Sequence, residues 1–259
     1  MPNTEIVRKL IEADKIVPAL AKADTIICMS EILEECCRMV GINTTLKVLG
    51  NRLYPDNFYP TRRKSHEMKI RLLFVGRLVE QKNIHGIVSA LTILKERGYS
   101  VHLDICGGNF MNSYLWECVS KLEQKEWKYH GSVANNRLNK LYNSADMYIG
   151  PSTFEGFQIP LIEALATGTP CIASDIPPAS TIIDAQIGEL VDPLVPESIA
   201  NGIEKLKKRL NSPVQYKLIF ASCIARSKKY DYFKISLNEA HIYLDLLEND
   251  NVQESKKDH

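Results

Sequence analysis

The sequence predicts an α/β fold built on a doubly wound parallel sheet of the Rossmann-like kind. Short apolar runs alternate with helical patterns between residues 70 and 210, and strands that alternate with helices assemble into parallel sheets. The run at 147–149 is apolar throughout and is bounded by Gly150-Pro151, which is typical of a strand buried on both faces. A chain of 259 residues, 45% of them hydrophobic, can bury such a core.

A shorter α/β segment precedes this domain. A helical pattern covers residues 5–23, and the apolar run at 24–29 indicates a buried strand. Ser30 is a good N-cap for a second helix that ends at Gly41, and residues 45–49 indicate another strand. This segment is too short to be a Rossmann domain by itself, and the polar residues 50–67 that follow it are interpreted as a linker.

The elements of the main domain follow one another in a regular order. Strands are predicted at residues 70–75, 101–105, 127–130, 147–149, 171–174 and 189–191. Helices are predicted at residues 84–96, 111–124, 136–143, 159–166 and 196–210, with a turn segment at 177–183. The expected divisions are an N-terminal segment with its linker (1–60), the main domain (61–212), one or two C-terminal helices (213–248) and a polar, disordered tail (249–259).

Composition argues against several classes of function. The net charge of +1 creates no field that would attract nucleic acid. No apolar run reaches the roughly 20 residues that span a bilayer, and residues 1–15 lack the apolar core of a signal peptide. Seven cysteines without a C-x-x-C pair are interpreted as reduced core thiols of a cytoplasmic protein. The basic residues 62–64 most simply face solvent, with peripheral membrane contact as the minor alternative.

The sequence also lacks the motifs of several common enzymes. The six histidines do not cluster with the cysteines, so no metal site is expected. No G-x-S-x-G, Walker loop or G-x-G-x-x-G is present, which argues against hydrolases, kinases and dehydrogenases. We therefore expect no bound cofactor.

Residues 150–174 are where the main domain is expected to bind a ligand. In open α/β sheets, ligands lie outside the carboxyl ends of the strands, against helix N-termini that favour anions. Glu155 on the loop, and Glu163 in the expected first turn of the helix at 159–166, would add carboxylates for sugar hydroxyls. The plainer alternative, weighted equally, is that Glu163 only complements the helix dipole, which is worth about 0.3–1 kcal/mol.

A second candidate element follows the strand at 70–75. The strand runs into Gly76, whose missing side chain lets the backbone approach a ligand. Arg77 comes next, and Lys82 lies just before the following helix. Two cations at the carboxyl edge of a strand suit a diphosphate, although an isolated pair of this kind is more often two ordinary surface cations.

These two elements resemble those of a known family. Glu155 and Glu163 form an E-x7-E pattern inside P-S-x-x-E-G-F-x-x-P-x-x-E-A-x-A-x-G-x-P, and residues 76–82 form G-R-x-x-x-x-K. Both resemble the retaining glycosyltransferases of family 4, which have the GT-B fold. The run ADTIICMSEILEECC resembles the end of that family's N-terminal domain.

The resemblance implies a role for each matching residue. Arg77 and Lys82 would bind the diphosphate and stabilise the charge of the leaving group, and Glu163 would hold the ribose hydroxyls. Glu155 would orient the donor sugar and complete the catalytic set of Arg77, Lys82 and Glu155. The region His130-Gly131-Ser132-Val133, with Arg137, resembles the part that packs on the nucleotide base. The donor-binding set is Gly76, Arg77, Lys82, Val133, Glu155, Gly156, Phe157, Gln158, Ile159 and Glu163.

The implied reaction is the transfer of a sugar from a UDP- or GDP-sugar to a hydroxyl acceptor, with retention of configuration and without an essential metal. Only the part before residue 50 resembles the family's N-terminal domain, so the acceptor site is expected to need a partner chain or a second copy. The alternative is a non-catalytic nucleotide-sugar-binding module or a degenerate remnant of a transferase. A structural domain without a ligand is the third and least favoured interpretation.

Overall fold

The computed structural model describes residues 16–61, 69–108 and 113–255, with side chains described up to residue 248. Contacts divide the chain into a smaller unit, residues 1–53 with 229–259, and a larger unit, residues 54–228. This division falls at other places than the predicted boundaries, because the helix that follows residue 212 belongs to the larger unit and only the last helix belongs to the smaller one.

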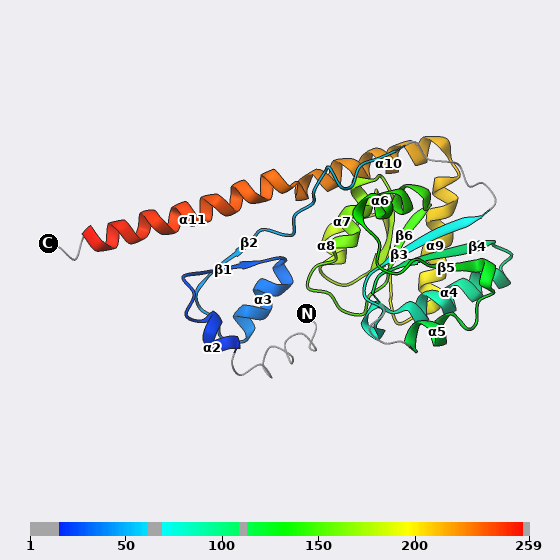
Figure 1. Ribbon diagram of the computed structural model, residues 1–259, viewed down its shortest axis with the longest axis horizontal. Coiled ribbons are helices and arrows are strands. Elements are labelled where there is room, and N and C mark those ends of the chain that lie inside the picture. The colour runs from blue at the N-terminus through cyan, green and yellow to red at the C-terminus, as the bar shows by residue number, and fades with distance from the viewer. Residues whose placement is uncertain (1–15, 62–68, 109–112, 256–259) are drawn as a thin grey trace. The chain divides into compact units, whose positions relative to one another are not determined.

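The larger unit is built on a parallel sheet of six strands, which confirms the predicted fold class (Figure 1). The strand order is β5-β4-β3-β6-β7-β8, so β3 and β6 are neighbours at the point where the order of the strands reverses. Crevices at such switch points are where doubly wound sheets bind ligands. The strands are β3 (Ile70–Val75), β4 (Val101–Cys106), β5 (Trp127–Tyr129), β6 (Met147–Gly150), β7 (Cys171–Ser174) and β8 (Gly188–Val191).

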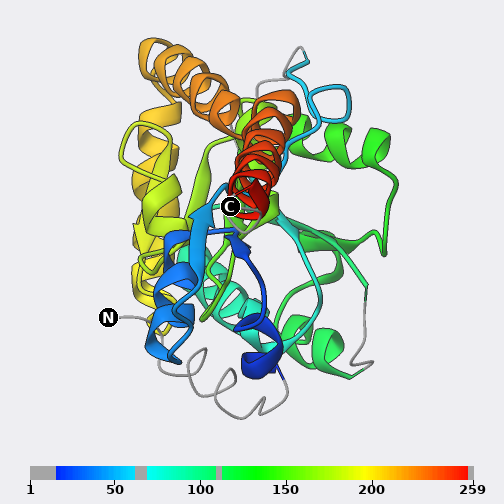
Figure 2. The ribbon, with the colours of Figure 1, turned by 90° about the vertical axis from the view of Figure 1, so that its left-hand side faces the viewer.

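Helices cover both faces of this sheet. In Figure 1, α4 and α5 lie on one face and α6 and α7 on the other. The helix α9, yellow in Figure 2, contacts both α4 and the edge strand β8, whereas α10 packs on α7. The helices are α4 (Ile84–Glu96), α5 (Tyr114–Val119), α6 (Asn135–Ser144), α7 (Ile159–Ala166), α8 (Ala179–Ile182), α9 (Pro196–Leu210) and α10 (Pro213–Ser227), with 3-10 turns η1 (Glu80–Lys82) and η2 (Gln124–Glu126).

The core of the larger unit lies in the central strands. Residues of β3 and β6 such as Leu72, Leu73, Met147 and Tyr148 have at most 1% of their surface exposed. Side chains alternate between the two faces of a strand, so burial of consecutive residues requires a covering layer on each face. The apolar runs in the sequence therefore predicted these strands correctly.

One predicted helix of the larger unit is wrong in its extent. The helix predicted at 111–124 is observed only as α5, Tyr114–Val119, and residues 111 and 112 lie outside the described residues. The physical reason is local. Glu123 and Glu126 form a reciprocal capping box that starts the 3-10 turn η2, so the chain leaves the helical path before it reaches residue 124.

The smaller unit contains the predicted helix–strand–helix–strand segment. Its elements are α2 (Ile16–Leu20), β1 (Thr25–Cys28), α3 (Glu31–Met39) and β2 (Thr45–Val48), and β1 pairs with β2 in parallel. Residues 5–15 of the first predicted helix lie outside the described residues. A small cluster of Cys28, Cys37, Ile42 and Leu46 forms its core.

The last helix, α11 (Tyr232–Ser255), corrects the prediction for the C-terminal end. Residues 249–255, expected to be disordered, continue this helix, and residues 256–259 lie outside the described residues. Adding residues to an existing helix costs little, since nucleation is the unfavourable step. Polar composition alone therefore does not end a helix that has already formed.

All seven cysteines are buried and unpaired, as their sequence contexts predicted. None of the described helices combines the length and the apolar character that crossing a membrane requires.

Candidate functional site

Two loops meet at the switch point of the large sheet. The loop after β3 and the loop after β6 leave the same edge, because β3 and β6 are adjacent parallel strands. The backbone N–H of Thr153 donates to the carbonyl of Gln81 at 2.9 Å. The Gln81 side-chain amide donates to the carbonyl of Phe154 at 2.6 Å. The structure thus ties the segment that contains Lys82 to the segment that contains Glu155.

Lys82 and Glu155, both predicted site residues, form an ion pair between these loops. Only 14% of the Lys82 side chain and 10% of the Glu155 side chain are exposed. A buried charge is tolerated when its partner stays in place, and removing one partner of such a pair typically costs about 3–5 kcal/mol. The pair therefore holds an ammonium group and a carboxylate in a fixed position at the carboxyl edge of the sheet.

Asn83, which the sequence analysis missed, joins a third loop to these two. Its backbone has the left-handed φ of 58°, and its side-chain oxygen accepts from the Gly86 N–H at the start of α4. Its amide nitrogen donates to the carbonyls of Pro151 at 3.1 Å and Pro193 at 2.6 Å. The available signal was an asparagine directly before an apolar helix, since asparagine suits both N-caps and left-handed backbone.

Gln158 uses its side chain to support the β6–α7 loop from within. Its amide nitrogen donates to the Tyr148 hydroxyl at 3.1 Å and to the Gly150 carbonyl at 3.0 Å. A Cβ at Gly150 would overlap both the Gln158 amide and the Tyr148 hydroxyl, so any larger residue there would displace these hydrogen-bonding groups. Both N–H groups of the amide are therefore engaged, whereas its Oε1 atom is buried and has no hydrogen-bond partner within the described residues, so the side chain could still accept a hydrogen bond from a donor hydroxyl.

Glu163 lies in the second turn of α7, which corrects the prediction that it lies in the first. The helix begins at Ile159 and its first turn contains no acidic residue. The interpretation of Glu163 as a partner of the helix dipole therefore loses its support, because that effect is confined to the first turn. Glu163 instead accepts a hydrogen bond from the Tyr142 hydroxyl of α6 at 2.8 Å.

Burial makes the Glu163 carboxyl a weaker acid than an exposed glutamate. Desolvation raises the pKa of this carboxyl to about 7, although the Tyr142 hydrogen bond acts in the opposite direction. The pKa of the buried Tyr148 hydroxyl is raised well above its ordinary value, first by burial and then by the charges of Glu155 and Glu163. Both carboxylates therefore lie near enough to Tyr148 to act on the same group.

The remaining predicted site residues lie on the loops at this edge. Gly76 follows β3, and a Cβ at Gly107 would overlap the Gly76 carbonyl oxygen, so the loops after β3 and β4 are in close contact. Arg77 is exposed, and within the described residues it forms no ion pair with Glu155 or Glu163. The structure brings Lys82 and Glu155 together, and within the described residues no hydrogen bond or ion pair joins Arg77 or Val133 to that pair. Among the predicted site residues, the following are also partly or largely exposed: Val133, Gly156, Phe157 and Ile159.

The described part of the chain contains no group of three or more His, Cys, Asp and Glu side chains arranged to hold a metal ion. The charged groups at the switch point are thus those of the loops themselves.

Comparison with known proteins identifies the family. Residues 57–217 match the family model described as glycosyl transferases group 1. The chain belongs to this family. All the predicted site residues of this glycosyltransferase-family chain fall within the matched range.

Curated relatives extend the match beyond the larger unit. Glycosyltransferase MJ1607 of Methanocaldococcus jannaschii is 30% identical over 212 residues, which cover 76% of this chain and 54% of that protein. A GDP-mannose-dependent alpha-(1-6)-phosphatidylinositol dimannoside mannosyltransferase of Mycobacterium tuberculosis is 28% identical over 198 residues, covering 73% of this chain and 50% of that protein. The family chain described here spans about half the length of the curated relatives it matches.

Solved structures share its fold. Sucrose-phosphate synthase from Thermosynechococcus elongatus aligns with a TM-score of 0.80 at 23% identity, covering 90% of this chain and 61% of that one. Anabaena Alr3699/HepE, solved in complex with UDP-glucose, aligns with a TM-score of 0.74 at 18% identity, covering 86% of this chain and 64% of that one. These likenesses establish the fold, and the structural neighbours are GT-B glycosyltransferases.

Proposed function

We propose that the chain carries the donor half of a glycosyltransferase, which moves a sugar from a nucleotide diphosphate sugar to a hydroxyl acceptor with retention of configuration. The observation that carries this proposal is the Lys82–Glu155 pair, held at the switch point by the linked loops after β3 and β6. A cation and a carboxylate fixed side by side can contact a diphosphate and the attached sugar at the same time.

The charges at this edge suit the departure of a diphosphate. When the bond between the sugar carbon and the diphosphate oxygen breaks, negative charge accumulates on the leaving group, and the acceptor oxygen forms the new bond while its proton passes to that group. Lys82 and Arg77 would stabilise the accumulating charge, a role that a divalent metal ion can fill in other enzymes. We therefore propose that the transfer needs no metal ion.

The carboxylates would bind hydroxyl groups of the donor. Glu155 would orient the donor sugar, together with backbone N–H groups of the β6–α7 loop, Gly156 to Ile159. Glu163 would hold the ribose, since it lies near Tyr148 and keeps one oxygen on Tyr142. The donor is a UDP- or GDP-sugar in this proposal: one relative is named for GDP-mannose, and one solved neighbour was determined with UDP-glucose.

The acceptor site would be completed by another polypeptide, either a partner chain or a second copy. A second candidate function follows from the same pair of charges. A fixed cation and carboxylate would also suit a module that binds nucleotide sugars without turning them over.

Measuring the release of nucleoside diphosphate from a panel of UDP- and GDP-sugars, with and without a hydroxyl acceptor, separates the two functions. For the enzyme we expect release that persists in excess EDTA and is lost in Arg77→Ala and Glu155→Gln. Lys140→Ala, an exposed cation on α6, is the matched control and should retain release. Donor binding without release under every condition would favour the module, and release abolished by EDTA would refute metal independence.

A further inference from the structure

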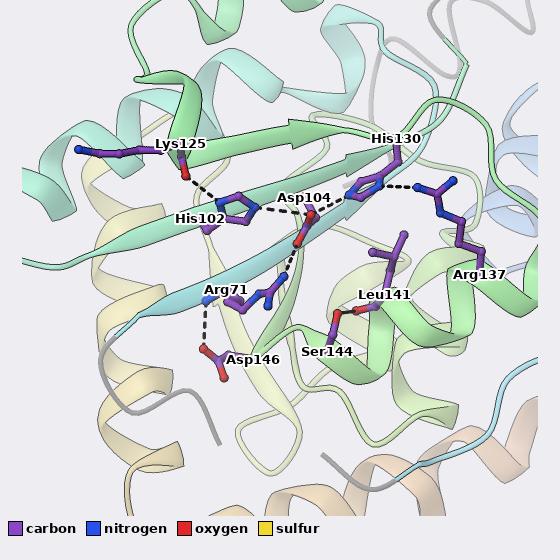
Figure 3. A network of polar contacts seen from close by, with 9 residues as sticks. All are labelled: Arg71, His102, Asp104, Lys125, His130, Arg137, Leu141, Ser144 and Asp146. Carbon is purple, nitrogen blue, oxygen red and sulfur yellow. Dashed lines mark hydrogen bonds and ion pairs between the residues drawn. The ribbon is translucent and has the colours of Figure 1, made fainter. Parts of the chain in front are cut away.

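A carboxylate is buried in the strand next to the candidate site. Asp104 lies on β4 with 3% of its surface exposed, in a sheet whose neighbouring side chains are mostly apolar. Its Oδ1 atom lies 2.7 Å from Nε2 of His130 and 3.6 Å from Nε2 of His102, and its Oδ2 atom accepts from Arg71 at 3.3 Å (Figure 3). Burial alone would raise the pKa of Asp104, but these hydrogen bonds and charges outweigh it and hold the pKa below its ordinary value. Asp104 therefore remains a carboxylate.

The hydrogen-bond partners of His130 determine which of its ring nitrogens donates and which accepts. Its Nε2 faces the Asp104 carboxylate, which can only accept, so the proton lies on Nε2. Its Nδ1 lies 3.2 Å from a terminal nitrogen of Arg137, which can only donate, so Nδ1 must accept (Figure 3). The ring therefore connects a buried carboxylate to an arginine at the surface and orients that arginine.

Arg137 is placed by this chain of contacts at the carboxyl edge of the sheet. It is the third residue of α6, it is exposed, and His130 directly follows β5. In the described part of the chain, its guanidinium has a hydrogen bond to His130 alone, so its other N–H groups are available to a ligand. A cation in the first turn of a helix works against the helix dipole, which makes a purely stabilising role unfavourable.

Glycines in contact with one another connect the loop after β5, which precedes Arg137, with the loop that contains Lys82. Gly107 donates its N–H to the Gly131 carbonyl at 2.9 Å, and it is in close contact with Gly76. Neighbouring strands lie about 4.8 Å apart, so the ends of β3 and β5 are separated by about 10 Å. This separation matches the span from the diphosphate to the base of an extended nucleotide.

We propose that Arg137, positioned by His130 and Asp104, recognises a guanine base, so that the donor is a GDP-sugar. The inference rests on the proposed function and names the substrate class of the same site. Guanine presents two adjacent acceptors, O6 and N7, which match the fork of an arginine. Adenine places an amino group beside N7, and uracil places an N–H beside each of its carbonyl oxygens, so neither offers the paired acceptors.

Calorimetric titration of the full chain with GDP and with UDP tests this inference. We expect the wild type to bind GDP more tightly than UDP. Arg137→Ala should weaken GDP binding by about 10- to 100-fold, the usual loss of one bidentate contact, and change UDP binding by less than about threefold. The control Lys140→Ala removes another exposed cation of α6 and should leave both affinities unchanged.

The outcomes distinguish a failure of the guanine assignment from a failure of the proposed function. Equal affinities for GDP and UDP in the wild type, or an equal loss of both in Arg137→Ala, would overturn the guanine assignment and leave nucleotide binding intact. Binding of neither nucleotide would overturn the proposed function, and the guanine assignment with it.

The positioning role of His130 has a separate readout. His130→Leu removes the acceptor for Arg137 and should lower the ratio of GDP affinity to UDP affinity, whereas His130→Gln keeps an acceptor and should restore part of that ratio. Thermal melting of both variants checks the fold, and the surface variant Arg137→Ala keeps the inference testable if either variant fails to fold. A ratio that is the same in the Leu and Gln variants would contradict the positioning role.

Discussion

At the scale of single residues, the candidate site depends on charges that are buried together with their partners. Lys82 is paired with Glu155, and Asp104 is surrounded by Arg71 and the two histidines. Glu163 differs from these residues, because its partner is a neutral hydroxyl. A buried carboxyl that has no cationic partner resists ionisation. Glu163 therefore makes the free energy of unfolding depend on pH.

Glu163 should lower the free energy of unfolding as pH rises. Its pKa in the folded protein is about 7, raised by burial from 4.5, so the folded state binds more protons than the unfolded state between these pH values. The contribution of Glu163 to the free energy of unfolding is then largest below about pH 4.5 and falls as the pH rises toward 7. We expect a fall of about 2 kcal/mol, less than the full shift implies because the side chain is partly exposed.

Urea denaturation of the wild type and Glu163→Gln at several pH values between 5 and 8 measures this effect. The variant keeps an acceptor for Tyr142 but cannot ionise, so its stability should lack this fall. Parallel curves for the two proteins across this range would show that Glu163 titrates normally in the folded state.

At the scale of elements, the loops after β3 and β4 are packed so closely that position 107 requires glycine. Gly76, Gly107 and Gly131 all have positive φ, but they differ in the space around them. A Cβ at Gly107 would overlap the Gly76 carbonyl, whereas a Cβ at Gly131 would meet no atom within 4 Å. The two positions therefore allow steric overlap to be separated from backbone strain.

Gly107→Ala should destabilise the protein more than Gly131→Ala. Both substitutions place a side chain on a left-handed backbone, which costs about 1–2 kcal/mol. Gly107→Ala adds a clash with backbone that cannot rotate away, so we expect it to lose at least about 2 kcal/mol more than the control. Urea unfolding of both variants measures the difference, and equal losses would mean that the β3 and β4 loops separate easily.

The same elements illustrate what the sequence could predict. The helices α4, α7 and α9 have the predicted bounds because proline or glycine marks at least one end of each and their apolar faces are regular. Lys82 and Glu155 were singled out in the sequence because charged residues follow buried strands. Asn83 and Tyr142 were not, since their partners lie in other loops and helices, and periodicity reports burial without naming the contact. The pairing of Lys82 with Glu155, 73 residues apart, likewise needed the structure.

At the scale of the whole molecule, the larger unit carries the charged and glycine-rich loops that lie at the switch point of its sheet. This unit coincides closely with the range that matches glycosyl transferases group 1, residues 57–217. We propose that the cations after β3 bind the diphosphate of a nucleotide sugar at this edge.

Calorimetric titration with GDP and UDP of Arg77→Ala, Lys82→Gln and a matched control tests this claim most directly. The control is Lys95→Gln, because Lys95 is also paired with a buried glutamate, Glu126, but lies in the last turn of α4, at the opposite end of that helix from the site. Glutamine at position 82 can still hydrogen-bond to Glu155, so the fold should be retained. We expect at least a tenfold loss of affinity for the diphosphate in Arg77→Ala and in Lys82→Gln, with Lys95→Gln unchanged, since one charge-assisted contact is worth about 1.5–3 kcal/mol. Equal affinities in all the variants and the wild type would mean that these cations do not bind the diphosphate.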